Sequence, residues 1–251
     1  MSISSNSVIH YTNKLENLKG ILMNEGFRLK YCLETLNINY KVELSTAVPM
    51  VSFCDIPLSE VKNHIDSYGS YAIGLYKNWA KQNGLNPVLY LEKNSYISTS
   101  IARLIDRLLE LKSDPKTDKI LKVEILKLLL YCKNYEGYLK HGKIDDENYR
   151  FYNEREWRYV PKDEILIEKK AKPLIWGDTF LKEKDKNNET LKDIYCSFSP
   201  QDISYIIVDD ENDIPEILTT LNEVYEDKCT TKELKVLSTR IITKNQIYND
   251  F

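Results

Sequence analysis

The sequence lacks the motifs of most phosphate-binding and hydrolytic sites. It contains no G-x-G-x-x-G loop, no G-x-x-x-x-G-K-[ST] loop and no G-x-S-x-G nucleophile turn. Its three histidines, His10, His64 and His141, are not spaced as a metal-binding pair. We therefore expect no bound metal and none of the common nucleotide-binding loops.

Cysteine pairs and long apolar runs are also missing. The five cysteines are scattered and never form C-x-x-C, so we expect neither a zinc site nor disulfides, and a reducing cytoplasm fits best. No stretch approaches the roughly 18 apolar residues of a membrane span. The N-terminal MSISSNSVIHY has no basic region followed by an apolar one, so we expect no secretory signal and no membrane association. A formal net charge of −3 disfavours a clamp around long nucleic acid.

What remains is the pattern of an α+β protein of 251 residues. Runs rich in β-branched and aromatic residues predict strands over 7–12, 49–58, 71–76, 87–92, 154–160, 164–170 and 202–210. Leucine and isoleucine at helical spacing predict a helix capped by Asn13 and ended by a left-handed Gly26, and another over 213–225. The charged segment KEKDKNNET (182–190) predicts a loop.

Residues 95–140 have a different pattern. The segments SIARLIDRLLELK and DKILKVEILKLLLYCK repeat apolar residues at i, i+3, i+4 and i+7, which predicts two helices. Acidic residues alternate with the basic positions Lys112, Lys116, Lys119, Lys122, Lys127 and Lys133, which indicates a solvated face rather than a nucleic-acid surface. We expect one domain over 1–251 with a helical insertion at 95–140.

The segment NEREWRYV carries the most informative polar residues. If it is a continuous strand, Glu154, Glu156 and Arg158 share one face. Two carboxylates about 7 Å apart raise each other's pKa or require a nearby cation, and Arg158 could be that cation. The purely structural alternative is a solvated strand face with a surface salt bridge that contributes little.

The other polar candidates lie at or near strand and helix ends. They are His10, Tyr11, Thr12, Ser52, Phe53, His64, Tyr68 and Tyr71. Each has a structural alternative: His10 could bond a backbone carbonyl, His64 could stabilise a helix C-terminus, and the tyrosines could cover the core.

Four separated segments, in order, resemble the AbiGi family of bacterial abortive phage-infection proteins. They are IHYTNKLENLKGILMNEGF, VPMVSFCDIPLSEVKNHIDSYGSYAIGLYKNWAKQNGLNPVLYL, FYNEREWRYV and TRIITKNQIYNDF. Together they span most of the chain outside the helical insertion. The family carries the label of an antitoxin, so the resemblance implies a cognate toxin as partner.

A looser resemblance concerns the ADP-ribosyltransferase fold. A histidine in the first strand, a tyrosine in a middle strand and a later E-x-E follow the order of functional residues in that fold. The resemblance implies two small antiparallel sheets around a cleft that binds NAD as substrate. It implies Glu156 as the catalytic glutamate, Glu154 as the residue that orients the acceptor, and His10 as a ribose ligand. Either Tyr68 or Tyr71 would stack on nicotinamide, with Tyr11, Thr12, Ser52, Phe53 and His64 nearby.

The sequence thus leaves several functions open. The chain could transfer ADP-ribose to a protein, a nucleic acid or water. It could instead be a non-catalytic antitoxin that acts by contact, or a nucleotide sensor without turnover. Apolar side chains exposed on the helices of 95–140 would favour the contact function.

Overall fold

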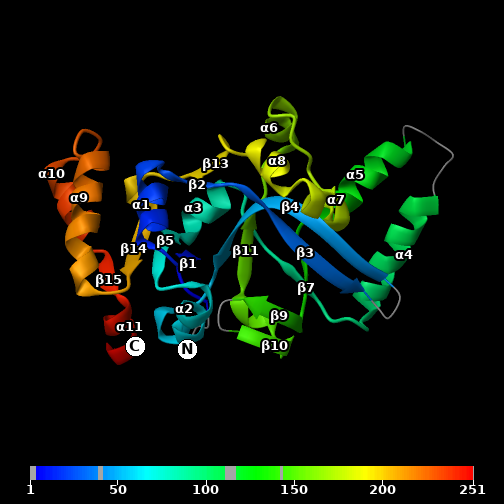
Figure 1. Cartoon of the computed structure of the whole chain (residues 1–251), viewed down its shortest axis with the longest axis horizontal. Coiled ribbons are helices and arrows are strands. Elements are labelled where there is room, and N and C mark those ends of the chain that lie inside the picture. Colours follow the sequence, from blue (N-terminus) through cyan, green and yellow to red (C-terminus); the bar gives the residue numbers. More distant parts are fainter. Residues whose placement is uncertain (1–3, 39–41, 111–116, 142–143, 251) are drawn as a thin grey trace.

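A long antiparallel hairpin runs through the middle of the protein (Figure 1). Its strands are β3 (Lys30–Ile38) and β4 (Val42–Cys54), which pair from Lys30 with Met50 to Ile38 with Val42. The computed structural model describes residues 4–38, 42–110, 117–141 and 144–250. The hairpin reaches from the centre of the protein to helices α4 and α5 at one end, whereas the C-terminal helices α9 and α10 lie at the other end (Figure 1).

The other elements are short. The remaining strands are β1 (Ser7–Thr12), β2 (Gly26–Arg28), β5 (Tyr71–Tyr76), β6 (Asn86–Pro87), β7 (Leu89–Leu91), β8 (Cys132–Asn134), β9 (Gly137–His141), β10 (Ile144–Tyr149), β11 (Glu156–Tyr159), β12 (Ile175–Trp176), β13 (Tyr195–Ser197), β14 (Ile203–Val208) and β15 (Ile241–Thr243). The helices are α1 (Leu15–Met23), α2 (Lys62–Tyr68), α3 (Lys77–Gln82), α4 (Tyr96–Glu110), α5 (Thr117–Leu129), α6 (Asp163–Glu168), α7 (Gly177–Lys182), α8 (Lys184–Glu189), α9 (Ile214–Tyr225), α10 (Thr231–Ser238) and α11 (Lys244–Asp250). Four 3-10 turns complete them: η1 (Leu58–Glu60), η2 (Phe151–Glu154), η3 (Pro200–Asp202) and η4 (Glu211–Asp213).

Strand β4 joins two groups of strands. Its first part pairs with β3 and, at Thr46 and Ala47, with β12. Its last residues pair with β11, and Cys54 also pairs with Ile9 of β1. The resulting nine-stranded sheet has the order β15-β14-β5-β1-β4-β11-β6, with β3 and β12 attached to β4.

The α+β class is therefore confirmed, whereas the arrangement of the strands differs from the prediction. We expected two small antiparallel sheets, but the described residues form one nine-stranded sheet together with three two-stranded sheets. Strand β14 pairs in parallel with β15, and β7 pairs in parallel with β8. The physical reason is the length of β4, which forms hydrogen bonds in both strand groups and so makes them continuous.

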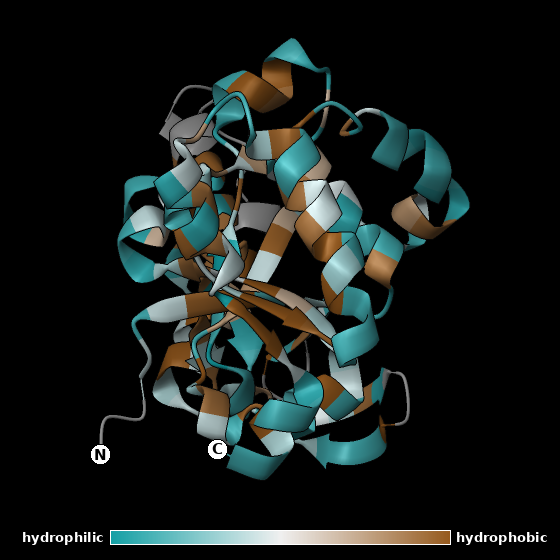
Figure 2. Cartoon of the chain, turned by 90° about the vertical axis from the view of Figure 1, so that its left-hand side faces the viewer, coloured by the Kyte–Doolittle hydropathy of each residue, from teal (hydrophilic) through white to brown (hydrophobic). Residues whose placement is uncertain are grey.

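Buried apolar residues cover both faces of the sheet. On one face, α1, α3 and α9 pack through Leu18, Trp79 and Ile217. On the other face, α2 and α11 pack through Ile65 and Ile247. Figure 2 shows the central strands mainly in the hydrophobic colour, whereas the surrounding helices carry both colours.

The helical insertion has its own core. Ile101 and Ile105 of α4 and Ile125 and Leu129 of α5 bury against Leu36 and its neighbours on the far part of the hairpin. The two predicted helices are thus present, but the segment also contains the short strands β8 and β9. Lys112 and Lys116 lie outside the described residues.

Three local predictions are wrong. Asn13 does not cap α1: the N-cap position is Lys14, and no side chain caps this helix. Gly26 begins β2 and pairs with Ser197, and the left-handed residue that ends the helical segment is Glu25. The strand predicted over 164–170 is also wrong, because residues 164–168 belong to the helix α6. A helix suits this segment because Leu166 is the one residue of α6 that is buried in the core.

The predicted loop over 182–190 also differs from the structure. It contains the helix α8, in which Asn187 and Lys186 bond back to Glu183. A charged sequence can form a helix when neighbouring side chains pair along it.

We predict that Gly69→Ala strongly destabilises the protein. Gly69 follows α2 with φ 114°, and a Cβ there would lie 2.4 Å from the carbonyl oxygen of Thr12. The free energy of unfolding should fall by about 2 kcal/mol or more because the close approach and the backbone strain act together. Denaturant titration measures this change.

Gly20→Ala is the matched control, because no atom lies within 4 Å of a Cβ at that helical position. It should stabilise α1 by about 0.5–1 kcal/mol. Equal effects of the two substitutions would contradict the position assigned to Gly69.

Candidate functional site

A sharp turn places the two carboxylates of the E-x-E segment beside one cation. Glu154 ends the 3-10 turn η2, and β11 begins only at Glu156, so the segment is not the continuous strand that we expected. Arg155 between them is left-handed, with φ 47°. Its backbone is fixed from both sides, because its N–H donates to the Tyr152 carbonyl and its carbonyl accepts from Asp55 N–H.

Lys133 is the cation that both carboxylates share. Its Nζ lies 2.7 Å from Glu154 Oε2 and 2.8 Å from Glu156 Oε2. Burial alone would lower the pKa of Lys133, but Glu156, Glu34 and Glu154 outweigh it and raise the pKa well above its usual value. We expected Lys133 on a solvated face, and this is wrong: β8 carries it inward.

Arg158 binds the Glu156 carboxylate oxygen that Lys133 does not contact. Its side chain is 0% exposed, and its Nε lies 2.6 Å from Glu156 Oε1. Its Nη2 lies 3.0 Å from Glu34 Oε2, and its Nη1 donates to the Leu130 carbonyl at 2.9 Å. The alternative of a solvent-exposed salt bridge is therefore wrong for Arg158, which belongs to a buried ion-pair network.

Glu156 is held in its ionised form by this network. The Ser52 hydroxyl donates to Oε1 at 2.6 Å, in addition to the bonds from Arg158 and Lys133. Burial opposes ionisation, but Arg158 and Lys133 outweigh it, so the pKa of the Glu156 carboxyl is lowered. Both oxygens already accept hydrogen bonds from cations, which favours the ionised form of this carboxyl.

Tyr68, and not Tyr71, joins the network. The Tyr68 hydroxyl donates to Glu154 Oε1, and burial together with the Glu154 charge raises the pKa of Tyr68. Tyr71 bonds instead to Asp213 Oδ2 at 3.1 Å, beside α9. We call the group formed by Glu34, Ser52, Tyr68, Lys133, Glu154, Glu156 and Arg158 the carboxylate network.

His10 lies on the opposite face of the sheet from Glu156. Ile9 and Glu156 both pair with Cys54, so their side chains share one face, and His10 points the other way. Its ring packs against Phe27 and Phe53 at centroid distances of 5.0 and 5.7 Å. The resemblance to the ADP-ribosyltransferase fold implied that His10 and Glu156 line one NAD-binding cleft, so that the imidazole faces the carboxylate, and this expectation is therefore wrong.

The contacts of His10 match its structural alternative. Nδ1 lies 2.8 Å from the Ser52 carbonyl, and since a carbonyl only accepts, Nδ1 is the donor. Burial lowers the pKa of His10, so the ring is neutral near pH 7. Phe53, on the same face, belongs to the main core.

Of the remaining candidates, one lies outside the carboxylate network and two lie on the face of the sheet that carries Glu156. Thr12 Oγ1 accepts from Asn17 at 2.9 Å and lies outside the network. Tyr11 and His64 lie on the Glu156 side of the sheet, with their rings 6.2 Å apart, and His64 is also 5.8 Å from the Tyr68 ring. Burial, with a smaller effect of Lys133, lowers the pKa of His64 to about 4.

The sequence did not indicate two residues at this site. Glu34 of β3 belongs to the carboxylate network, and Tyr90 of β7 borders it, because the Tyr90 hydroxyl accepts from the Glu156 N–H at 2.8 Å. Neither residue lies near the E-x-E segment in the sequence, and no local pattern singles them out. In the described part of the chain, no group of three or more His, Cys, Asp or Glu residues could hold a metal ion.

A cavity of about 700 Å³ opens beside this network. One wall comes from η1 and α2 and includes Asn63 and His64, and the other comes from β10 and η2 and includes Tyr149 and Arg155. Tyr149 connects the cavity to the network, because its hydroxyl is hydrogen-bonded to Tyr68. We call this space the α2 cavity.

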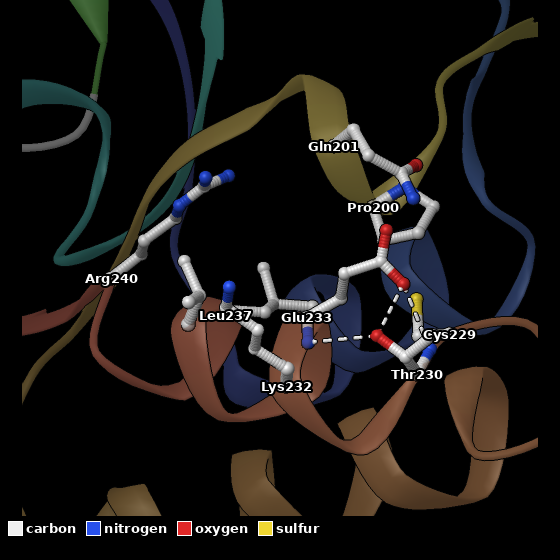
Figure 3. A pocket seen from close by; sticks show the side chains of 9 residues that line it. Pro200, Gln201, Cys229, Thr230, Lys232, Glu233, Leu237 and Arg240 are labelled. Atoms are coloured by element: carbon white, nitrogen blue, oxygen red, sulfur yellow. Dashed lines mark hydrogen bonds between the residues drawn. The ribbon is translucent and has the colours of Figure 1, made fainter.

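A separate hollow of about 410 Å³ lies at the start of α10 (Figure 3). Its carboxylate, Glu233, is already used within the helix cap: it accepts from Thr230 N–H and from Thr230 Oγ1, both at 2.8 Å. These bonds complete the capping box of α10 and leave that carboxylate committed to the helix terminus.

Comparison with known proteins identifies the family. A family model described as "Putative abortive phage resistance protein AbiGi, antitoxin" matches residues 25–209, which is well over half of the chain. The chain therefore belongs to the AbiGi family, as its sequence segments predicted.

A relative from Lactococcus lactis subsp. cremoris, named "Abortive phage resistance protein AbiGi", supports this assignment. It is 26% identical over 221 residues, which cover 81% of this chain and 89% of that protein. No solved structure matches this chain. Within the described ranges, every helix is too short or too polar to cross a membrane.

We predict that Lys133→Met destabilises the protein by about 3–5 kcal/mol, because it leaves Glu154 and Glu156 as neighbouring buried charges without their shared cation. Chemical denaturation at pH 7 measures the loss. Methionine keeps much of the apolar stem of lysine, so the change reports mainly on the charge.

Lys140→Met is the control, since the Lys140–Asp145 pair has side chains 70% and 59% exposed. Its effect should stay within about 0.5 kcal/mol. If Lys133→Met were equally mild, the carboxylates would not depend on Lys133.

Proposed function

We propose that this protein acts in abortive phage resistance as a non-catalytic, antitoxin-type component that restrains a toxin by direct contact. The apolar surface of the helical insertion carries the proposal. The exposed large apolar side chains of its helices include Tyr96 (94%), Ile97 (52%), Leu104 (40%), Leu121 (43%) and Leu128 (44%). Exposed apolar side chains that lie close together are typical of protein contact sites.

A groove in the same region could seat a partner side chain. It has a volume of about 240 Å³ and lies between α4, α5 and the hairpin, lined by Ile105, Leu126 and Leu129. Trp176 of β12 lines it as well and is 52% exposed. An exposed tryptophan beside an apolar groove has the chemistry of an interface hot spot.

The position of the insertion also supports the contact function. Helices α4 and α5 project at one end of the molecule, away from the C-terminal helices (Figure 1). The description of the family as an antitoxin agrees with such a role. The carboxylate network adds to this, because its charges are paired within the protein rather than presented to a substrate.

A second candidate function is ADP-ribosyl transfer or NAD hydrolysis. It is favoured by the position of Tyr68 beside Glu154 and Glu156, from which it is far apart in the sequence, next to the α2 cavity. Cleavage of the nicotinamide–ribose bond develops an oxocarbenium ion that a fixed carboxylate stabilises. For this chemistry Glu156 would have to give up its bond to Lys133 or Arg158 and accept a hydrogen bond from the ribose 2′-hydroxyl instead.

We predict that Trp176→Ala weakens the complex with the cognate toxin by about 30-fold, as expected for a hot-spot residue. Isothermal titration measures the affinity, and growth of cells that express both proteins reports neutralisation. Circular dichroism checks that the variant is folded.

Val236→Ser is the control, because Val236 is 46% exposed on α10 at the other end of the molecule. It should leave the affinity unchanged. Full neutralisation by Trp176→Ala, or equal losses for the two variants, would contradict a contact site on the insertion.

We predict that incubation of the purified protein with NAD releases no nicotinamide, because the Glu156 oxygens are occupied by Arg158, Lys133 and Ser52. Chromatography of the reaction measures the product. Release by the wild-type protein that is lost in Glu156→Gln would instead establish the second candidate function.

A further inference from the structure

We propose that the groove between α4, α5 and the hairpin selects an apolar and acidic segment of a partner protein, by taking up one bulky apolar side chain and pairing Lys122 with a carboxylate beside it. This inference rests on the proposed contact function and adds to it the chemistry of the segment that docks. We call the space of about 240 Å³ the insertion groove.

The strands β4 and β12 form one wall of the insertion groove. Thr46 of β4 pairs directly with Trp176 of β12, so their side chains lie on the same face of the sheet. Leu44, two residues before Thr46, shares this face and is buried in the core of the insertion. Trp176 stays 52% exposed beside these two buried residues. The indole is therefore an open apolar surface and not a member of the core.

One stripe of α5 forms the facing wall. Lys122, Leu126 and Leu129 line the groove, and their spacing of i, i+4 and i+7 places them on one side of the helix. Leu129 is buried in the insertion core, and Leu126 packs against that core while remaining partly exposed. The stripe thus changes from apolar at Leu129 to cationic at Lys122, one turn before Leu126.

The size of the groove favours a side chain over a small molecule. A volume of about 240 Å³ is below the about 300–1,000 Å³ that is typical of small-molecule sites. One side chain of a partner needs less room, because its backbone stays outside the groove. Anchors of this kind, which fill a pocket beside a tryptophan, supply much of the binding energy of protein interfaces.

Charge decides which apolar segment fits. Lys122 is the one charged side chain among the described residues that line the groove, and it has no ion pair within the described part of the chain. Lys127, the next lysine of α5, is instead paired with Glu124 at 3.2 Å and Asp163 at 3.4 Å. A partner carboxylate that meets Lys122 would complement the groove, whereas a partner cation there would be repelled.

The test uses the full chain labelled with 15N and three capped dipeptides as probes: phenylalanyl-glutamate, phenylalanyl-glutamine and phenylalanyl-lysine, each acetylated and amidated. The indole N–H signal of Trp176 should shift saturably with the glutamate dipeptide at millimolar concentrations. The glutamine dipeptide should bind about threefold more weakly, as expected for loss of a partly exposed ion pair, and the lysine dipeptide more weakly again. The Trp79 indole is buried and donates to the Ser197 carbonyl at 3.1 Å, so its signal should not shift.

Lys122→Glu should reverse this order, so that the lysine dipeptide binds most tightly. Lys235→Glu makes the same change of charge on α10, outside the groove lining, and is the matched control that should keep the order of the wild-type protein. The wild-type protein gives a second readout: its preference for glutamate over glutamine should shrink as salt is added.

The proposal would be overturned if none of the dipeptides shifted the Trp176 signal, if Lys122→Glu left the order unchanged, or if the preference for glutamate did not depend on salt. The contact function fails in a different way. If the dipeptides bind in the expected order while Trp176→Ala still neutralises the toxin fully, the groove has this selectivity and the contact function is wrong. If Trp176→Ala abolishes neutralisation while no dipeptide binds, the contact function stands and this inference is wrong.

Discussion

The buried pairing of three glutamates with Lys133 and Arg158 is the constraint on which the centre of the structure depends. Arg158 is completely buried and Glu156 is 4% exposed, so neither charge has water as an alternative partner. Each must therefore keep its partner in the folded protein. The network links β3, β4, β8 and β11, and so it fixes how the base of the helical insertion meets the main sheet.

The same constraint decides what the E-x-E segment can do. In an enzyme that stabilises a developing cation, a carboxylate must be available to the substrate. Here Lys133 bridges both carboxylates. Ser52 and Arg158 bind the other oxygen of Glu156, Oε1. The paired charges of the carboxylate network hold β3, β4, β8 and β11 together.

Local patterns in the sequence predicted much of the fold. Strands at 7–12 and 71–76 have the alternating or β-branched residues of buried strands, and the stripe over 213–225 is that of an amphipathic helix. The β3–β4 hairpin was only partly predicted, because the segment from Lys30 to Met50 has no Gly or Asn-Gly turn to mark its reversal. Segment 164–170 is short and apolar enough to form either a strand or a helix, and tertiary packing favours the helix.

The site was predicted in part for a similar reason. Glu154, Glu156 and Tyr68 were found because they are close to recognisable segments, and their meeting depends on a left-handed Arg155 that no pattern signals. The direction of His10 depends on strand register, and both Val8 and Ile9 beside it are buried, so alternation could not decide it. Lys133 and Glu34 are ordinary surface types in the sequence, and only the long-range fold brings them inside.

The most direct test of this account is a 13C NMR titration of the Glu156 side-chain carboxyl in the folded protein, with its signal assigned by Glu156→Gln. If Arg158 and Lys133 hold the carboxylate ionised, its pKa lies clearly below the about 4.3 of an unperturbed glutamate. A titration at or above about 4.3 would show a carboxyl that is free or protonated, and would contradict the buried network.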